Sequence, residues 1–196
     1  AGLATALRQY GTLPLSAVLQ PAIRYAEKGF PVDETLSRII LDNTNLVQVH
    51  PATASVYLHE GFPRAEGDTV RQLDLAHTLR AIAQQGPAAF YTGPIAQAIA
   101  DEVVKCGGMM TREDLATYQP TITEPLTARY RGFTVLSAPP PHSGITVIEA
   151  LNILQNADLR DLGYYANSAE SFHLLAETLR RAYADRTAFL ADPRFE

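Results

Sequence analysis

Glycine and proline divide this chain into short segments, and their spacing constrains the fold more than any other feature of the sequence. Between them, apolar residues recur at helical spacing, and a proline in a first turn or a glycine just past a last turn marks where a helix begins or ends. Gly29, Gly86 and Gly107 are typical helix-ending glycines. The pattern predicts helices over about 3–9, 14–28, 33–50, 74–85, 94–106, 145–155 and 168–190.

Polar residues at helix starts refine these boundaries. Asp33 and Asp74 are expected to be N-caps, because their side chains accept hydrogen bonds from the free N–H groups of a first turn. Thr111 and Asp114 resemble a capping box with Asp in place of the usual Glu, and they predict one helical turn through Tyr118. Residues 53–73 are predicted to be irregular, with a brief strand over about 55–58.

The pattern changes after residue 120, where β-branched and aromatic residues predict two strands, the second over 133–137. Residues 139–144 (Pro-Pro-Pro-His-Ser-Gly) predict a rigid corner at the end of that strand, because proline cannot donate to a β-ladder. Ser168 is the expected cap of the longest helix. The buried candidates on that helix are Phe172, Leu175, Leu179 and Phe189.

These elements predict an α+β fold. Residues 1–120 form a mainly helical lobe, and residues 121–196 contribute strands, the proline-rich corner and the long helix. With no internal repeat and no low-complexity linker, residues 1–196 are predicted to be a single unit.

Composition excludes several classes of protein. The net charge is -5 without clustered Lys or Arg, which argues against a nucleic-acid partner. A single cysteine, Cys106, rules out an intramolecular disulfide and a cysteine-based metal cluster. No apolar run is long enough to span a bilayer, and no targeting signal is visible at the first residues. The chain is therefore expected to be a segment of a longer polypeptide.

The residues that could carry chemistry form no complete constellation. His142 and Ser143 are neighbours, but adjacent residues rarely face each other, and the Gly-x-Ser-x-Gly elbow is incomplete. His173 and Glu177 share a helix face but lack a third metal ligand, so an exposed pair is expected, as for Glu177 with Arg180 and Arg181 and for Asp185 with Arg186. Cys106 precedes the negative end of a helix, and Gly107-Gly108 lacks the residues of a phosphate loop. No catalytic, cofactor-binding or metal-binding residue is predicted, and no cofactor.

Ordered landmarks along nearly the whole chain resemble the large subunit of the γ-glutamyltransferase family. They are 10–15 (Tyr-Gly-Thr-Leu-Pro-Leu), 20–22, 29–32, 66–72, 74–76, 78–79, 86–87, 89–93, 107–108, 111–118, 130–132, 139–141, 151–154, 182–186 and 192–193. The family commonly has Pro-Pro-Pro-Ser-Ser-Gly-Gly at the corner, whereas this chain has His142 in place of the first serine and lacks the second glycine.

The resemblance implies an N-terminal nucleophile hydrolase with αββα layers, made as a zymogen that cleaves itself into two subunits. The new N-terminal Thr of the small subunit then attacks a γ-glutamyl amide such as glutathione, and the acyl-enzyme passes the glutamyl group to water or an amino acid. By the resemblance, the small subunit is the expected partner, a γ-glutamyl compound is the substrate, and the compartment is periplasmic or extracellular. The nucleophile lies downstream and the substrate-binding arginine upstream, so this segment is expected to be an inactive scaffold.

Three alternatives stay open at this point. One is a related amidohydrolase or acylase of the same fold, and another is a non-enzymatic helical interaction module. The third is a serine hydrolase centred on Ser143 and His142, which requires an acidic partner within hydrogen-bond reach of His142.

Overall fold

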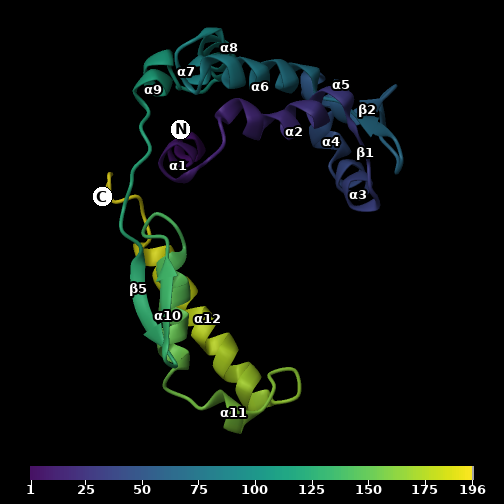
Figure 1. Ribbon diagram of the computed structural model, residues 1–196. Helices are drawn as coiled ribbons and strands as arrows, with labels where there is room; N and C mark the ends of the chain where they lie inside the picture. Colours follow the sequence, from purple (N-terminus) through teal and green to yellow (C-terminus); the bar gives the residue numbers. More distant parts are fainter. Residues whose placement is uncertain (196) are drawn as a thin grey trace. The chain divides into compact units, whose positions relative to one another are not determined.

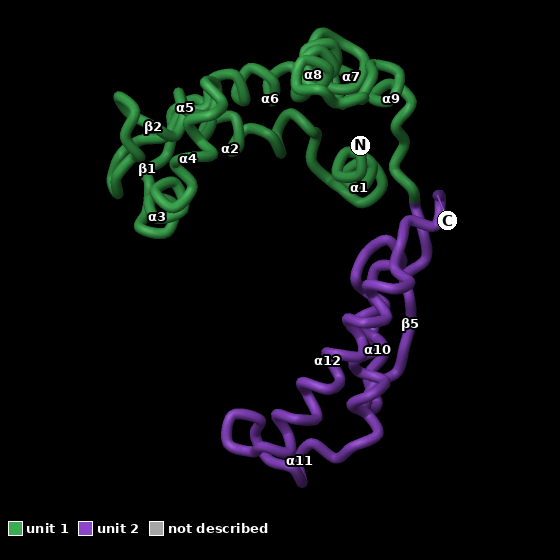
Figure 2. The backbone as a smooth tube through the Cα atoms, turned by 180° about the vertical axis from the view of Figure 1, so that it is seen from behind, with its two compact units in different colours: residues 1–121 green, residues 122–196 purple. Residues whose placement is uncertain are grey.

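The computed structural model describes residues 1–195 and comprises two compact units, Ala1–Thr121 (unit 1) and Ile122–Glu196 (unit 2). Figure 2 colours the two units separately. The boundary lies close to residue 120, where the sequence pattern changes. That residues 1–196 act as one domain stays a prediction, and each unit is described by itself.

Short helices and small two-stranded antiparallel ribbons make up unit 1 (Figure 1), and the described residues contain three such ribbons in all. Two of these ribbons, β1 with β4 and β2 with β3, lie in unit 1, and the third belongs to unit 2. The elements are α1 (Gly2–Tyr10), α2 (Leu15–Lys28), β1 (Phe30–Pro31), α3 (Glu34–Asp42), α4 (Thr44–Val47), α5 (Pro51–Tyr57), β2 (Leu58–His59), β3 (Phe62–Pro63), β4 (Thr69–Val70), α6 (Leu73–Gln85), α7 (Ala88–Tyr91), α8 (Pro94–Lys105) and α9 (Arg112–Thr117).

The core of unit 1 lies where α2 packs against α6. Ile23 and Ala26 of α2 and Ala76 of α6 are buried there. Val70 of β4 and Val32, which directly follows β1, add to this core and are 0% and 2% exposed. These side chains give unit 1 a hydrophobic core of its own, which is the main source of folding free energy for a unit without disulfides.

Several predicted boundaries in unit 1 are confirmed, and three are wrong. Asp33 caps α3 through a 2.7 Å hydrogen bond from the Leu36 N–H, but the predicted helix over 33–50 breaks at Asn43 into α3 and α4. The expected strand over 55–58 is mostly part of helix α5, which begins with Pro51 in its first turn. The residue pattern had not indicated a helix here. Asp74 lies inside the first turn of α6, whose N-cap is Gln72.

Unit 2 is a β-hairpin with helices packed on it. It contains β5 (Leu126–Tyr130), β6 (Phe133–Ser137), α10 (Gly144–Leu154), α11 (Leu159–Leu162) and α12 (Ala169–Phe189). The strands pair from Leu126 with Ser137 to Tyr130 with Phe133, and the connecting Arg131 and Gly132 have φ of 47° and 88°. Two successive positive φ values are the signature of the tight turn that suits the twist of a hairpin. Helix α10 contacts both strands, and α12 packs along α10.

The proline-rich corner lies where the sequence predicted it, between the end of β6 and the start of α10. Gly144 opens α10 in a tight space, where an added Cβ would lie 2.6 Å from the Ser137 Oγ and closer still to the Ala138 carbonyl oxygen. The strand-to-helix corner therefore depends on a residue without a side chain at position 144.

The buried face of α12 differs from the prediction. Phe172, Leu179 and Phe189 are 60%, 43% and 80% exposed, and Leu175 is half-buried. The buried residues are the small ones, Ser171, Thr178 and Ala182. Small side chains allow the axes of α10 and α12 to come close together, so the large ones are left on another face of the helix.

No helix of the described residues combines the length and the apolar character that are needed to cross a bilayer.

Candidate functional site

The corner residues His142 and Ser143 do not form a catalytic pair. Both side chains are exposed, and the backbone N–H of His142 donates to the Pro139 carbonyl at 3.1 Å. Within residues 1–195, no hydrogen bond joins the two side chains, and no carboxylate accepts one from His142. The serine-hydrolase alternative required both contacts, so the geometry does not favour it.

His173 and Glu177 lie on the exposed side of α12, where Glu177 is occupied by arginine. Arg180 donates two hydrogen bonds to its carboxylate, at 3.0 and 2.7 Å, and Arg181 lies 3.9 Å away. The hydrogen bond from Arg180 is the main cause that holds the pKa of Glu177 below its usual value. The described part of the chain contains no group of three His, Cys, Asp or Glu side chains that could hold a metal ion.

Asp185 was predicted to form an exposed pair with Arg186, but the structure gives the two residues other neighbours. The Arg186 guanidinium lies over the ring of Tyr183, 5.5 Å from its centroid. Asp185 faces Glu149 of α10 instead, and the pKa of Glu149 is raised by burial first and then by the hydrogen bond and negative charge of Asp185. Sequence reasoning missed this pair, because 36 residues separate two positions that only the packing of α12 on α10 brings together.

Cys106 is exposed at the C-terminal end of α8, where its Sγ lies 3.9 Å from a Glu102 carboxylate oxygen. Gly107 follows with φ of 82° and no neighbouring atom within 4 Å of an added Cβ. These residues form a helix ending, as the sequence predicted, and the thiol is a donor to the Glu102 carboxylate.

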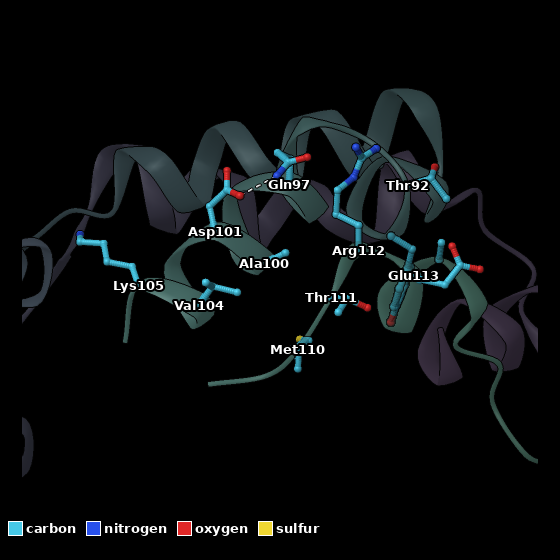
Figure 3. A pocket seen from close by; sticks show the side chains of 12 residues that line it. Thr92, Gln97, Ala100, Asp101, Val104, Lys105, Met110, Thr111, Arg112 and Glu113 are labelled. Atoms are coloured by element: carbon cyan, nitrogen blue, oxygen red, sulfur yellow. Dashed lines mark hydrogen bonds between the residues drawn. The ribbon is translucent and has the colours of Figure 1, made fainter. Parts of the chain in front are cut away.

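A groove of about 820 Å³ lies between α8 and the segment that leads into α9 (Figure 3). Ala100, Val104 and Met110 form its apolar floor, and Lys105 and Arg112 lie at its edges. On α8, the Gln97 amide donates a 2.6 Å hydrogen bond to the Asp101 carboxylate.

Local structure fixes the wall of this groove. Thr111 and Asp114 form the predicted capping box, with the Thr111 hydroxyl 2.7 Å from the carboxylate, and this hydrogen bond is the main cause of the lowered pKa of Asp114. Tyr91 stacks on Tyr118 with 6.0 Å between ring centroids.

The groove can therefore accommodate an apolar group at its floor. Two threonine hydroxyls line the groove, and both are engaged. The Thr111 hydroxyl is hydrogen-bonded to Asp114, and the Thr92 hydroxyl donates to the Ala88 carbonyl at 3.0 Å. No histidine lines it to act as a base. The sequence did not predict the groove, although the exposed Met109 and Met110 after a glycine pair mark its position.

Comparison with solved structures places this architecture in a known class. The chain matches the crystal structure of Helicobacter pylori γ-glutamyltranspeptidase with a TM-score of 0.93 and 34% identity, over 100% of this chain and 56% of that chain. The helical lobe and the covered hairpin are therefore part of an N-terminal nucleophile hydrolase fold.

The sequence defines the family. The family model described as gamma-glutamyltranspeptidase matches residues 1–196, and the chain belongs to this family, as its landmarks indicated. The Escherichia coli glutathione hydrolase proenzyme is 42% identical over 100% of this chain and 34% of its own length. The acylase ACY 1 proenzyme of Pseudomonas sp. SE83 is also 42% identical, over 99% of this chain and 35% of its own length. The chain thus spans about a third of the curated relatives it matches.

Proposed function

We propose that this chain is a scaffold segment of the large subunit of a γ-glutamyl transferase or hydrolase. The parent enzyme cleaves γ-glutamyl amides such as glutathione through a threonine acyl-enzyme and passes the glutamyl group to water or an amino acid. The observation that carries the proposal is the match of the family model to the whole chain, together with the glutathione hydrolase name of a relative at 42% identity.

The described residues support a scaffold role. Covalent catalysis of this type requires a nucleophile beside a base, and donors aimed at the position of the developing oxyanion. His142 and Ser143 are both exposed and make no hydrogen bond with each other, and Thr111 is engaged in a capping box. The acyl-transfer groups therefore belong to another part of the parent protein.

Chain lengths support a two-subunit parent. This chain spans 34% of the E. coli proenzyme but 56% of the single chain in the H. pylori structure. The H. pylori chain is therefore much shorter than the E. coli proenzyme. Cleavage of a proenzyme into a large and a small subunit produces such a difference in length. The small subunit is accordingly the proposed partner, and the parent is proposed to be cleaved between the two subunits.

The test compares two proteins in an assay with γ-glutamyl p-nitroanilide: the 196-residue chain and the full-length protein that its gene encodes. The 196-residue chain is expected to stay at the level of the buffer blank, and the full-length protein to release p-nitroaniline after it has matured. Release by the folded 196-residue chain contradicts the scaffold role, and a matured full-length protein without turnover contradicts the proposed activity.

An acylase parent is the second candidate, because an acylase proenzyme is as similar as a glutathione hydrolase proenzyme, at 42% identity. The same full-length preparation assayed with a glutaryl amide distinguishes the two, and higher kcat/KM for the glutaryl amide favours the acylase. The interaction-module alternative gains no support, since these relatives are named for hydrolase and acylase activities.

A further inference from the structure

A second hollow in unit 1 lies between α2 and α6, beside the buried Ile23. This α2–α6 hollow has a volume of about 380 Å³ and shares no lining residue with the groove at α8. The polar residues that line it from α2 include four at intervals of four, which places them in one row along the helix: Ser16, Gln20, Arg24 and Lys28. Arg80 and Gln84, also four residues apart, line it from α6. Two packed helices thus present polar side chains to one space.

Positive charge is in excess in the α2–α6 hollow, because three basic residues and one acidic residue line it. The acidic residue, Glu27, forms an ion pair with Arg80 across the two helices. Arg24 and Lys28 form no ion pair with any residue that the structure describes, and the Arg24 guanidinium lies 5.8 Å from the centroid of the Tyr25 ring. Like charges four residues apart on a helix repel each other. The chain therefore leaves an excess of two positive charges here, three basic residues against one acidic, although its net charge is -5.

Neutral hydrogen-bond donors complete the lining of the α2–α6 hollow. The Ser16 hydroxyl and the side-chain amides of Gln20 and Gln84 make no hydrogen bond with another described residue. A hydroxyl and a primary amide can each donate to the oxygen of an anion. Arginine donates through a planar guanidinium that matches the oxygen pairs of phosphate and carboxylate groups, and lysine adds a compact charge. The hollow therefore offers both charged and neutral donors to one oxyanion.

We propose that the α2–α6 hollow binds a phosphate group, with Arg24 and Lys28 as charged contacts and Ser16, Gln20 and Gln84 as neutral donors. The excess charge selects phosphate over carboxylate, because a phosphate monoester carries a charge of about -1.5 to -2 at neutral pH and a carboxylate carries a single charge. The inference goes beyond the proposed function, since acyl transfer from a γ-glutamyl amide involves no phosphate group. Inorganic phosphate and a phosphate monoester share this chemistry, and a titration distinguishes the two sources.

Calorimetric titration of the full-length protein at about pH 7.5 and low ionic strength tests the site, because a phosphate monoester is mainly a dianion under these conditions. The titrants are inorganic phosphate and glycerol phosphate, and acetate is the comparison with a single charge. Saturable binding of phosphate is expected, and tighter binding of one of the two phosphate compounds identifies the source. A titration without phosphate binding, or one in which acetate binds with equal affinity, overturns the proposal.

Two double variants with the same change in charge locate the binding. Arg24→Gln with Lys28→Gln is expected to raise the Kd for phosphate at least about tenfold, because it removes two hydrogen bonds to a charged group. Arg8→Gln with Arg38→Gln is the control, since these exposed arginines lie outside the hollow. Solvent screening should keep its effect on the Kd below about twofold. Equal weakening by both double variants would show a general charge effect and overturns the proposal.

The side-chain amide signals of glutamine provide a second readout that needs no variant. With isotope-labelled glutamine in the full-length protein, the NMR signals of the Gln20 and Gln84 amides are expected to shift when phosphate is added. The Gln97 amide, which donates to Asp101 on α8, should keep its position. Unshifted Gln20 and Gln84 signals at saturating phosphate would place the anion elsewhere and contradict the proposal. Neither measurement depends on enzymatic turnover, so a failure of the proposed activity is recognised separately.

Discussion

Units 1 and 2 are stabilised in different ways. Among the described residues, all but one of the buried hydrophobic side chains lie in unit 1, and the exception is Ala182 of α12. The other buried side chains of unit 2 are polar: Thr146, Ser171 and Thr178. The hydroxyls of Thr146 and Thr178 have no hydrogen-bond partner there. A buried hydroxyl without a partner costs free energy, whereas buried aliphatic area gains it.

This difference indicates which region needs the rest of the parent. Unit 1 buries its own core where α2 meets α6, and its groove at α8 is a surface feature. Unit 2 buries little apolar surface by itself, while large side chains on α12 and the β6 edge stay open. We therefore expect unit 1 to be the more stable of the two units in the 196-residue chain.

The largest expected effect comes from the core of unit 1. Ile23→Ala removes a side chain that is 4% exposed on α2 and leaves a cavity against α6, at a cost of about 3 kcal/mol in the free energy of unfolding. Val18→Ala on the same helix is the control, because Val18 is 44% exposed. Urea unfolding followed by circular dichroism measures both. Equal effects of the two variants would show that α2 and α6 are not the core of unit 1.

A smaller effect is expected at the corner of unit 2. Gly144→Ala places a Cβ 2.6 Å from the Ser137 Oγ and even closer to the Ala138 carbonyl, so it should destabilise unit 2 by about 2 kcal/mol. Gly2→Ala is the matched control, since Gly2 also opens a helix and has no atom within 4 Å of an added Cβ. Hydrogen exchange of the α10 amides reports the change. Unaltered exchange in Gly144→Ala would mean that the corner can relax without cost.

A third effect is expected at α9, a short helix of unit 1 that has no buried residue. Thr111→Ala removes the capping box of α9 and should cost about 1 kcal/mol, seen as faster exchange of the α9 amides at neutral pH. The hydrogen bonds from Thr111 lower the pKa of Asp114 below 3.8, so their stabilisation is present above that pH and is lost as the pH falls through the lowered pKa. The difference between variant and parent should therefore shrink below about pH 3.8. A constant difference down to pH 2 would contradict the role of the Asp114 carboxylate.

Helix boundaries and the corner could be predicted because their signals are local. Asp33, Ser168 and the Thr111–Asp114 pair act within one turn of the residues that they cap, and each was found in the structure as predicted. Asp74 failed because an acidic residue favours the whole first turn, not only the cap position. The family resemblance was confirmed as well, since it rested on ordered landmarks along the whole chain.

The buried face of α12 could not be predicted, because that helix is apolar on two sides. Phe172 and Leu179 have the larger side chains, but Ser171 and Thr178 are the buried residues, and a sequence pattern does not identify which side of a helix meets a partner. The groove at α8 and the pair of Glu149 with Asp185 depend in the same way on contacts between separate elements. Catalytic residues were not predicted in this segment, and that expectation stays a prediction.

The smallest expected effect is the pH dependence of unit 2. Burial and Asp185 raise the pKa of Glu149 above 4.5, so the folded state favours its protonated form and loses stability as the pH rises through the raised pKa. Glu149→Gln keeps the shape without the charge and should raise the melting temperature at pH 7 by about 1 °C, with no gain at pH 4. Glu124→Gln, on an exposed carboxylate outside the helices, is the control. A gain of the same size at both pH values would exclude charge repulsion with Asp185 as the cause.

Limited proteolysis of the 196-residue chain, followed by mass spectrometry, tests most directly whether the two units differ as proposed. Cleavage under native conditions follows the free energy of local opening, so the unit without an apolar core should be lost first. We expect a resistant fragment close to residues 1–121, together with rapid cleavage within α10 and α12. Survival of residues 122–195 as the resistant fragment, or loss of both units at the same rate, would contradict it.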